Sequence, residues 1–172
     1  MLILKAESAA YAGRLQRARE MSQQASDSAE RAGEKETAAG YIAQSALREA
    51  LFGNTAEART RARAAIKRSS GRDVQYGAAL ALAFSGEDAE VRSIIDDLAR
   101  RFPDDTIVQY NYLATLRGIV TLNHGKTADA VDRLQFARPY ELGGTTQAAA
   151  TGGTRSTPPS CEVKRTCELA RV

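Results

Sequence analysis

The side chains that most often carry catalysis or bind metals are scarce in this chain. His124 is the only histidine, and Cys161 and Cys167, six residues apart, are the only cysteines. Structural zinc sites draw on more closely spaced cysteines together with further ligands. A Ser/His/Asp or Cys/His catalytic set would have to use the single histidine, and nothing near it in the sequence completes one. The sequence therefore predicts neither an enzyme nor a metal or cofactor site.

The strongest charge feature is a basic run with only neutral residues between its members: Arg59, Arg61, Arg63, Lys67, Arg68 and Arg72. Such a run can form a patch for an acidic partner or for nucleic acid. It can also be the solvated face of a helix whose C-terminal end favours cations, which is the preferred interpretation. No aromatic residue interleaves with these charges for base stacking, and the whole chain carries a net charge of only +3. Nucleic acid is therefore not an expected partner.

A repeated pattern indicates which elements position these residues. Four blocks begin with glycine and have alanine or valine five residues later, and they are GRLQRA, GNTAEA, GEDAEV and GKTADA at 13–18, 53–58, 86–91 and 125–130. The spacings between the glycines are 40, 33 and 39 residues. Repeats of this length are typical of stacked helical hairpins, in which glycine ends a helix in the left-handed conformation.

The same register predicts where paired helices approach one another. Small residues lie seven positions before each glycine, and small or apolar residues lie five, nine and twelve positions after it. The three later offsets differ by four and three residues, so they share one face of a helix. The sixteen positions are Ala6, Ala46, Ala79, Gly118, Ala18, Ala58, Val91, Ala130, Ser22, Ala62, Ile95, Leu134, Ala25, Ala65, Leu98 and Ala137.

The predicted fold is all-α, a right-handed solenoid of about four antiparallel helix pairs in one domain over residues 1–142. An alanine-rich composition with 43% hydrophobic but only 6% aromatic residues favours close-packed helices over a sheet sandwich. Pro103 ends one helix, and Asp104 or Asp105 can cap the next. The expected pairs are 2–12 with 14–32, 35–52 with 55–68, 72–85 with 87–101, and 105–123 with 127–137.

In such an array the first helices of the pairs line a concave groove, which is the expected contact surface for a partner. Counting back from Gly86 and Gly125 places six residues on the groove side: Asp73, Tyr76, Leu80, Tyr112, Thr115 and Ile119. Tyrosine is favoured at recognition sites because its ring is apolar and its hydroxyl is polar. The alternative is that Tyr76 and Tyr112 seal the interface between neighbouring repeats, and the sequence leaves both interpretations open.

The spacing resembles the tetratricopeptide repeat, in which a small residue in the first helix, a turn, alanine and apolar positions in the second helix, and often a closing proline recur. The match is best in the third unit, where Pro103 takes the closing position. Residues 8–142 are also similar to helical-repeat regions attached to bacterial serine/threonine protein kinases and, in some cases, to winged-helix regulators. The phrases that carry this second resemblance are YAGRLQRARE, KETAAGY, ALREALFGN, GRDVQYGAALALA, DDLARRFPDDTIVQYNYL and PYELG.

The resemblance implies a binding scaffold and not kinase activity. The sequence contains no glycine-rich phosphate loop and no HRD or DFG motif, which phosphoryl transfer by a kinase requires. The expected function is a non-catalytic scaffold that holds a peptide or protein segment in the groove, and oligomerisation through exposed terminal repeats is a further expectation. Two alternatives stay open: a regulatory or sensor fragment of a bacterial serine/threonine kinase or transcription regulator, and a truncated gene fragment with no independent role.

Residues 143–172 differ from the rest in composition. The stretch GGTTQAAATGGTR has almost no large apolar residue, and STPPSCEVKRTCELARV follows it. This composition predicts a low-complexity, disordered tail. Codons for the tail, read in a shifted frame, permit the string YPxFVRGEAYLRARQG, which is close to the helix that follows PYELG in the resembling family. A frameshifted fifth repeat is therefore a further expectation.

The N-terminal residues give no sign of membrane targeting. The start, MLILKAES, has only four apolar residues in a row. That run is too short for the apolar region of a signal peptide or for a membrane span. No membrane partner and a cytoplasmic location are therefore expected.

Overall fold

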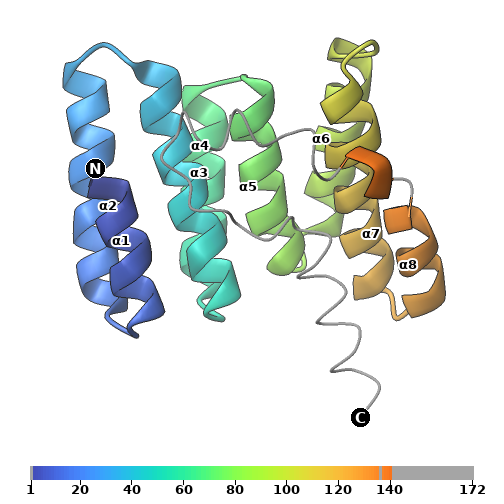
Figure 1. Cartoon of the computed structure of the whole chain (residues 1–172), viewed down its shortest axis with the longest axis horizontal. Coiled ribbons are helices and arrows are strands. Elements are labelled where there is room, and N and C mark those ends of the chain that lie inside the picture. The colour runs from blue at the N-terminus through green and yellow to red at the C-terminus, as the bar shows by residue number, and fades with distance from the viewer. Residues whose placement is uncertain (1, 136, 141–172) are drawn as a thin grey trace.

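The computed structural model describes residues 2–135 and 137–140 (Figure 1). Over these residues the chain forms eight α-helices and no strand, which confirms the all-α prediction. The helices are α1 (Leu2–Tyr11), α2 (Leu15–Arg31), α3 (Lys35–Leu51), α4 (Thr55–Arg68), α5 (Arg72–Phe84), α6 (Asp88–Arg101), α7 (Leu113–Asn123) and α8 (Thr127–Gln135). A π-helical segment, η1 (Val108–Tyr112), precedes α7, and a 3₁₀ turn, η2 (Arg138–Tyr140), follows α8. The disorder and the shifted frame expected for 143–172 lie outside the described residues.

The turn glycines behave as the spacing predicts. Gly13, Gly53, Gly86 and Gly125 have φ angles of +72°, +81°, +80° and +75°, in the left-handed region that favours glycine. The turns close in the Schellman manner: at the first one, the N–H of Gly13 bonds to the carbonyl of residue 10 at 2.9 Å, and the next N–H bonds to residue 9 at 2.8 Å. The first six helices consequently begin and end within one residue of their predicted limits.

The helices stand side by side in a row that runs from α1 and α2 at one end to α7 and α8 at the other (Figure 1). Each helix packs against the next one along the chain. In addition, α3 packs against α5, and α5 packs against α7. The first helices of the last three pairs therefore form one continuous layer.

The predicted register of small residues is the register of the core. All sixteen positions are buried. Gly118 shows why small residues are needed there, because a Cβ atom added to it would lie 3.2 Å from Cγ and Cδ2 of Leu134 on α8. That separation is tighter than ordinary van der Waals contact, so the close approach of α7 and α8 depends on glycine at this position.

The apolar core is not evenly distributed along the row. The main core cluster runs from Ala39 in α3 to Leu134 in α8. The first helix pair has a separate small cluster made of Ala9, Ala10 and Ala18. The attachment of the first pair therefore involves contacts outside the main core cluster, and the polar contacts described below are among them.

The segment before α7 departs from the predicted regular helix over 105–123. Asp105 caps it, since its Oδ1 accepts bonds from the N–H groups of Ile107 and Val108 at 3.0 and 3.1 Å. The chain then forms the π-helical turn η1, and Leu113 donates its N–H to the carbonyl of Val108. A π turn holds one more residue than an α turn, so residues before Leu113 are rotated relative to a regular helix. The prediction that placed Tyr112 by counting back from Gly125 assumed a regular helix and does not account for this rotation.

Candidate functional site

Two tyrosines from neighbouring helix pairs stack face to face. The rings of Tyr76 on α5 and Tyr112 at the end of η1 have centroids 3.8 Å apart and planes inclined by 1°. The hydroxyl of Tyr112 donates a hydrogen bond of 2.8 Å to Oδ1 of Asp73. These contacts join the third and fourth pairs, which supports the interpretation of the tyrosines as an inter-pair seal. Both rings stay partly exposed, so the seal is also part of the surface.

The environment of Tyr112 keeps its hydroxyl protonated. Burial raises the pKa of Tyr112 above its ordinary value, and the nearby carboxylate of Asp73 raises it further. The charged form of the phenol would be poorly solvated and would face a negative charge. Tyr112 therefore acts as a hydrogen-bond donor here and is not poised for acid–base chemistry.

A basic residue at the start of α5 completes this cluster. Nε of Arg72 lies 3.3 Å from Oδ1 of Asp73, and its Nη1 pairs with Oδ2 of Asp105. Burial alone would raise the pKa of Asp105, but the backbone N–H of Val108 and the guanidinium of Arg72 hold that pKa below its ordinary value. Arg72 is thus occupied by internal carboxylates, and Asp73 keeps an exposed side chain beside the ring pair.

Three of the six predicted groove residues are buried. Leu80, Thr115 and Ile119 are 3%, 1% and 1% exposed, and the two aliphatic side chains belong to the main core cluster. The expectation that these three residues line an open groove is therefore wrong. The first helices α5 and α7 pack directly against one another. Asp73, Tyr76 and Tyr112 remain as the accessible part of the predicted surface.

Two arginines of the basic run, both on α4, pair with carboxylates of the next helix pair. Nε of Arg59 lies 2.8 Å from Oε1 of Glu87, and its Nη2 donates to the carbonyl of Ser85 at 2.7 Å. Arg63 pairs with Glu87 at 3.2 Å and with Glu90 at 2.8 Å. These contacts connect α4 to α6 and to the turn before it.

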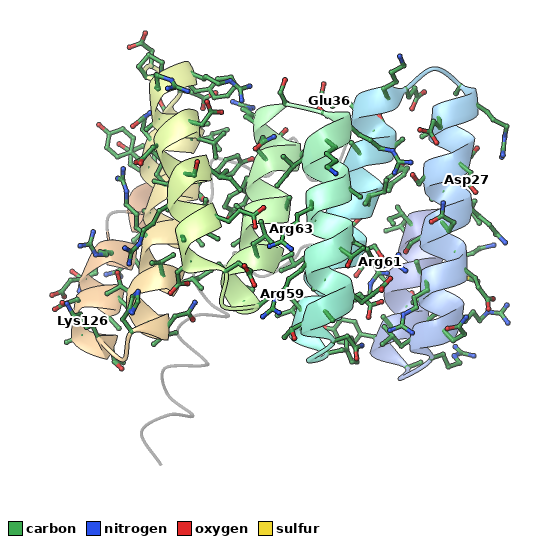
Figure 2. All side chains as sticks on the ribbon, turned by 180° about the vertical axis from the view of Figure 1, so that it is seen from behind. Asp27, Glu36, Arg59, Arg61, Arg63 and Lys126 are labelled. Carbon is green, nitrogen blue, oxygen red and sulfur yellow. The ribbon has the colours of Figure 1, made fainter. Side chains whose placement is uncertain are left out.

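Other members of the run point elsewhere. Figure 2 shows Arg59 and Arg63 on one side of α4 and Arg61 on the other. Nε of Arg61 lies 2.7 Å from Glu57 on the same helix, and Nε of Arg68 lies 3.6 Å from Glu30 on α2. Lys67 is exposed. Since its five arginines diverge and pair with carboxylates, the run does not present one cationic face, which supports the preferred interpretation of this sequence.

A buried ion pair between the first and second helix pairs has no counterpart in the sequence-based prediction. Glu49 on α3 has a side chain that is 1% exposed, and Arg19 on α2 donates to both of its oxygens at 2.7 Å. Nδ2 of Asn54 donates to Oε2 at 2.9 Å. Burial would raise the pKa of Glu49, but the hydrogen bonds from Arg19 and Asn54 hold it below its ordinary value.

A buried arginine, Arg48, directly precedes Glu49 in the sequence. Arg48 is 6% exposed, and it donates to Oε1 of Glu7 on α1 at 2.6 Å and to Oγ of Ser22 on α2 at 2.9 Å. One signal could have revealed the network, since ALREAL places two adjacent opposite charges between alanine and leucine residues. Charged residues are rarely buried unless they are paired. We call the contacts of Glu7, Arg19, Ser22, Arg48, Glu49 and Asn54 the polar network.

An open hollow of about 520 Å³ lies where the turn between α3 and α4 faces α2, and it is lined in part by Arg19, Asn54 and Glu57. The side chains of Arg19 and Asn54 already donate to Glu49, so neither is available to a ligand in this hollow. Among residues 2–135 and 137–140, no group of three or more His, Cys, Asp or Glu side chains is arranged to hold a metal ion. No helix in this part of the chain has the length and apolar content to cross a bilayer.

Comparison with protein-family models, with curated proteins and with solved structures finds no match to this chain. What can be inferred about function therefore depends on the residues and the geometry described above.

Proposed function

We propose that this chain is a non-catalytic scaffold, similar to tetratricopeptide arrays, that binds a peptide or protein segment. The observation that carries the proposal is the repetition of one packing scheme, in which the same four offsets from the turn glycine are buried in every pair. The first helices α3, α5 and α7 also contact one another in succession. Stacked units of this kind expose extended faces that suit protein segments. The array is proposed to be a right-handed solenoid, as in the repeats that the sequence resembles.

The proposed contact surface is the accessible remainder of the predicted groove. The stacked pair of Tyr76 and Tyr112 is partly exposed, and the carboxylate of Asp73, which accepts the hydroxyl of Tyr112, lies beside it. Aromatic rings held rigidly by packing lose little entropy on binding and are enriched among residues that dominate binding energy. An extended segment with an apolar side chain next to a basic residue or a backbone donor fits this chemistry.

Peptide selection tests the proposal. Peptides displayed on phage are selected against the wild-type protein, and the affinities of the selected sequences are measured by isothermal titration calorimetry. The variant Asp73→Ala removes the carboxylate and with it the acceptor of the Tyr112 hydroxyl, while Arg72 keeps Asp105 as a partner. We expect it to weaken binding by about tenfold, a typical loss for a residue that contributes strongly to an interface.

The matched control is Gln16→Ala, an exposed position on α2 that bonds only within its own helix. We expect this variant to bind the selected peptides with wild-type affinity. If no peptide binds at a defined stoichiometry, or if Asp73→Ala and Gln16→Ala bind alike, the proposed surface is wrong.

A further inference from the structure

A hollow between α6, α7 and α8 collects three arginines from three helices. Its volume is about 340 Å³, and it is lined by Arg92 on α6, Arg117 on α7 and Arg133 on α8. Ile95 and Val120, which are 4% and 6% exposed, also line it and give it an apolar base. We call this feature the arginine hollow. The second helices α6 and α8 supply two of its walls, whereas the tyrosine surface lies on α5 and η1.

The charges of the arginine hollow are less compensated than those of the arginines in the basic run. Within the described part of the chain, no carboxylate lies within ion-pair distance of Arg117 or Arg133. Arg92 contacts His124 instead, with Nη2 and Nε2 2.9 Å apart. Asp96 is the one acidic residue among the lining residues, so three positive charges face one negative charge. The basic run differs, because each of its arginines has a carboxylate partner.

We propose that the arginine hollow binds an acidic segment of a partner protein. Guanidinium groups bind carboxylates with two parallel hydrogen bonds, and three of them around an apolar base suit carboxylates that flank an apolar side chain. Like charges gathered at one place repel each other, and an anionic occupant removes that repulsion. The inference goes beyond the proposed function, because it adds a second surface with a different ligand chemistry.

Two other occupants fit the hollow less well. None of the residues that line it is aromatic, so it offers no stacking surface for the bases of a nucleic acid. Residues 143–172 of the chain carry four basic and two acidic residues, so their charge is not complementary to the hollow. An acidic segment of another protein is the occupant that the charges and the apolar base favour.

The test uses a defined probe and a charge-matched control. A fluorescein-labelled peptide of alternating Glu and Leu residues is titrated with the full chain, and binding is followed by fluorescence anisotropy at several salt concentrations. The double variant Arg117→Gln, Arg133→Gln removes two charges from the hollow. The double variant Arg14→Gln, Arg17→Gln removes two charges from exposed positions on the first helix pair, far along the row.

We expect the Arg117→Gln, Arg133→Gln variant to bind the acidic peptide about tenfold more weakly or worse, and the control variant to bind within about twofold of the wild type. A peptide with Gln in place of Glu is expected not to bind. Because both substituted arginines are exposed, the melting temperature measured by circular dichroism should stay unchanged. If it falls, Arg133→Gln alone is used, with Arg17→Gln as its control.

Four results would overturn the proposal. The first is no binding of the acidic peptide by the wild-type chain. The second is an equal loss in both double variants, which would indicate general electrostatic attraction. The third is tighter binding of a single-stranded oligonucleotide than of the peptide at the same salt concentration, which would indicate nucleic acid. The fourth is dimerisation, measured by sedimentation, that the Arg117→Gln, Arg133→Gln variant abolishes, since this result would make a second copy of the chain the occupant.

Discussion

Glu49 is a buried charged residue that lies outside the predicted surface. Its carboxylate is buried and satisfied by Arg19 and Asn54. It therefore joins α2, α3 and the following turn at a place where the main core cluster contains no residue of the first pair. A partly buried pair of this kind need not add net stability relative to an apolar pair, but removal of the carboxylate leaves Arg19, whose side chain is 31% exposed, without its charge partner.

The variant Glu49→Gln should therefore destabilise the protein. We expect the free energy of unfolding to fall by roughly 2–4 kcal/mol, because Arg19 loses its charge partner and the amide replaces an acceptor with a donor. Urea denaturation followed by circular dichroism measures the change. The control is Glu20→Gln, at the exposed position next to Arg19 in the sequence. It should change the free energy of unfolding by less than about 0.5 kcal/mol. Equal stability of the two variants would show that the buried pair contributes little.

The lowered pKa values of Glu49 and Asp105 predict a direction for the pH dependence of stability. A carboxylate with a lowered pKa in the folded state binds its proton more readily when unfolded. Its contribution to stability is complete above the unfolded pKa, about 4.3 for Glu and 3.9 for Asp, and is lost as the pH falls through the folded value. We expect the free energy of unfolding to vary little between about pH 7 and 5 and to fall below about pH 4. Glu49→Gln should make that fall shallower, and an unchanged slope in denaturation curves across this range would contradict the assignment.

At the scale of elements, the spacing between helices is set by alanine and glycine. Ala58 is fully buried on α4, while Ala56, two residues earlier on the same helix, is exposed. Ala58→Arg should lower the free energy of unfolding by about 3 kcal/mol or more, because it overpacks a close helix contact and buries a charge. Ala56→Arg should leave the melting temperature nearly unchanged. Similar melting temperatures for the two variants would remove Ala58 from the contact.

Replacement of glycine by alanine should have opposite effects on stability at two positions in the second helix pair. Gly53 has a φ of +81° in the turn after α3, whereas Gly40 lies inside α3 with no atom within 4 Å of an added Cβ. Gly53→Ala should destabilise by about 1 kcal/mol, because alanine is strained in the left-handed region. Gly40→Ala should stabilise by up to about 1 kcal/mol through helix propensity. Chemical denaturation of both variants checks the sign, and a stabilising Gly53→Ala would contradict the turn geometry.

At the scale of the whole molecule, the row has unequal ends. The first helix pair has its own small alanine cluster and is joined to α3 through the polar network, whereas α3 to α8 share the main core cluster. In stacked arrays each unit is stabilised mainly by its nearest neighbours, so local opening can differ along the row.

Hydrogen exchange followed by mass spectrometry should reveal this asymmetry. We expect backbone amides of α1 and α2 to exchange faster than those of α3, α5 and α7, because less apolar area holds the first pair in place. Glu49→Gln should increase exchange in α1 and α2 more than in α7. Uniform protection along the row, or equal effects of the substitution on both ends, would show that the molecule opens as one unit.

The sequence by itself determined the helices and their register. Turn glycines, the small residue seven positions earlier and the apolar positions after each turn are local patterns, and helix geometry converts such patterns directly into a buried face. This is why the sixteen predicted positions are all buried. It is also why the limits of the first six helices were predicted to within one residue.

Only the tertiary structure decided which polar side chains meet and which apolar ones are covered. Arg19 and Glu49 are thirty residues apart, and Arg117 and Arg133 belong to different helices, so their arrangement depends on how neighbouring helices are placed and not on local periodicity. Leu80 and Ile119 were expected on an open surface because a count along one helix cannot give the distance between α5 and α7. Residue spacing fixes the face of a helix to which a side chain belongs, but the approach of other helices determines whether solvent reaches that face.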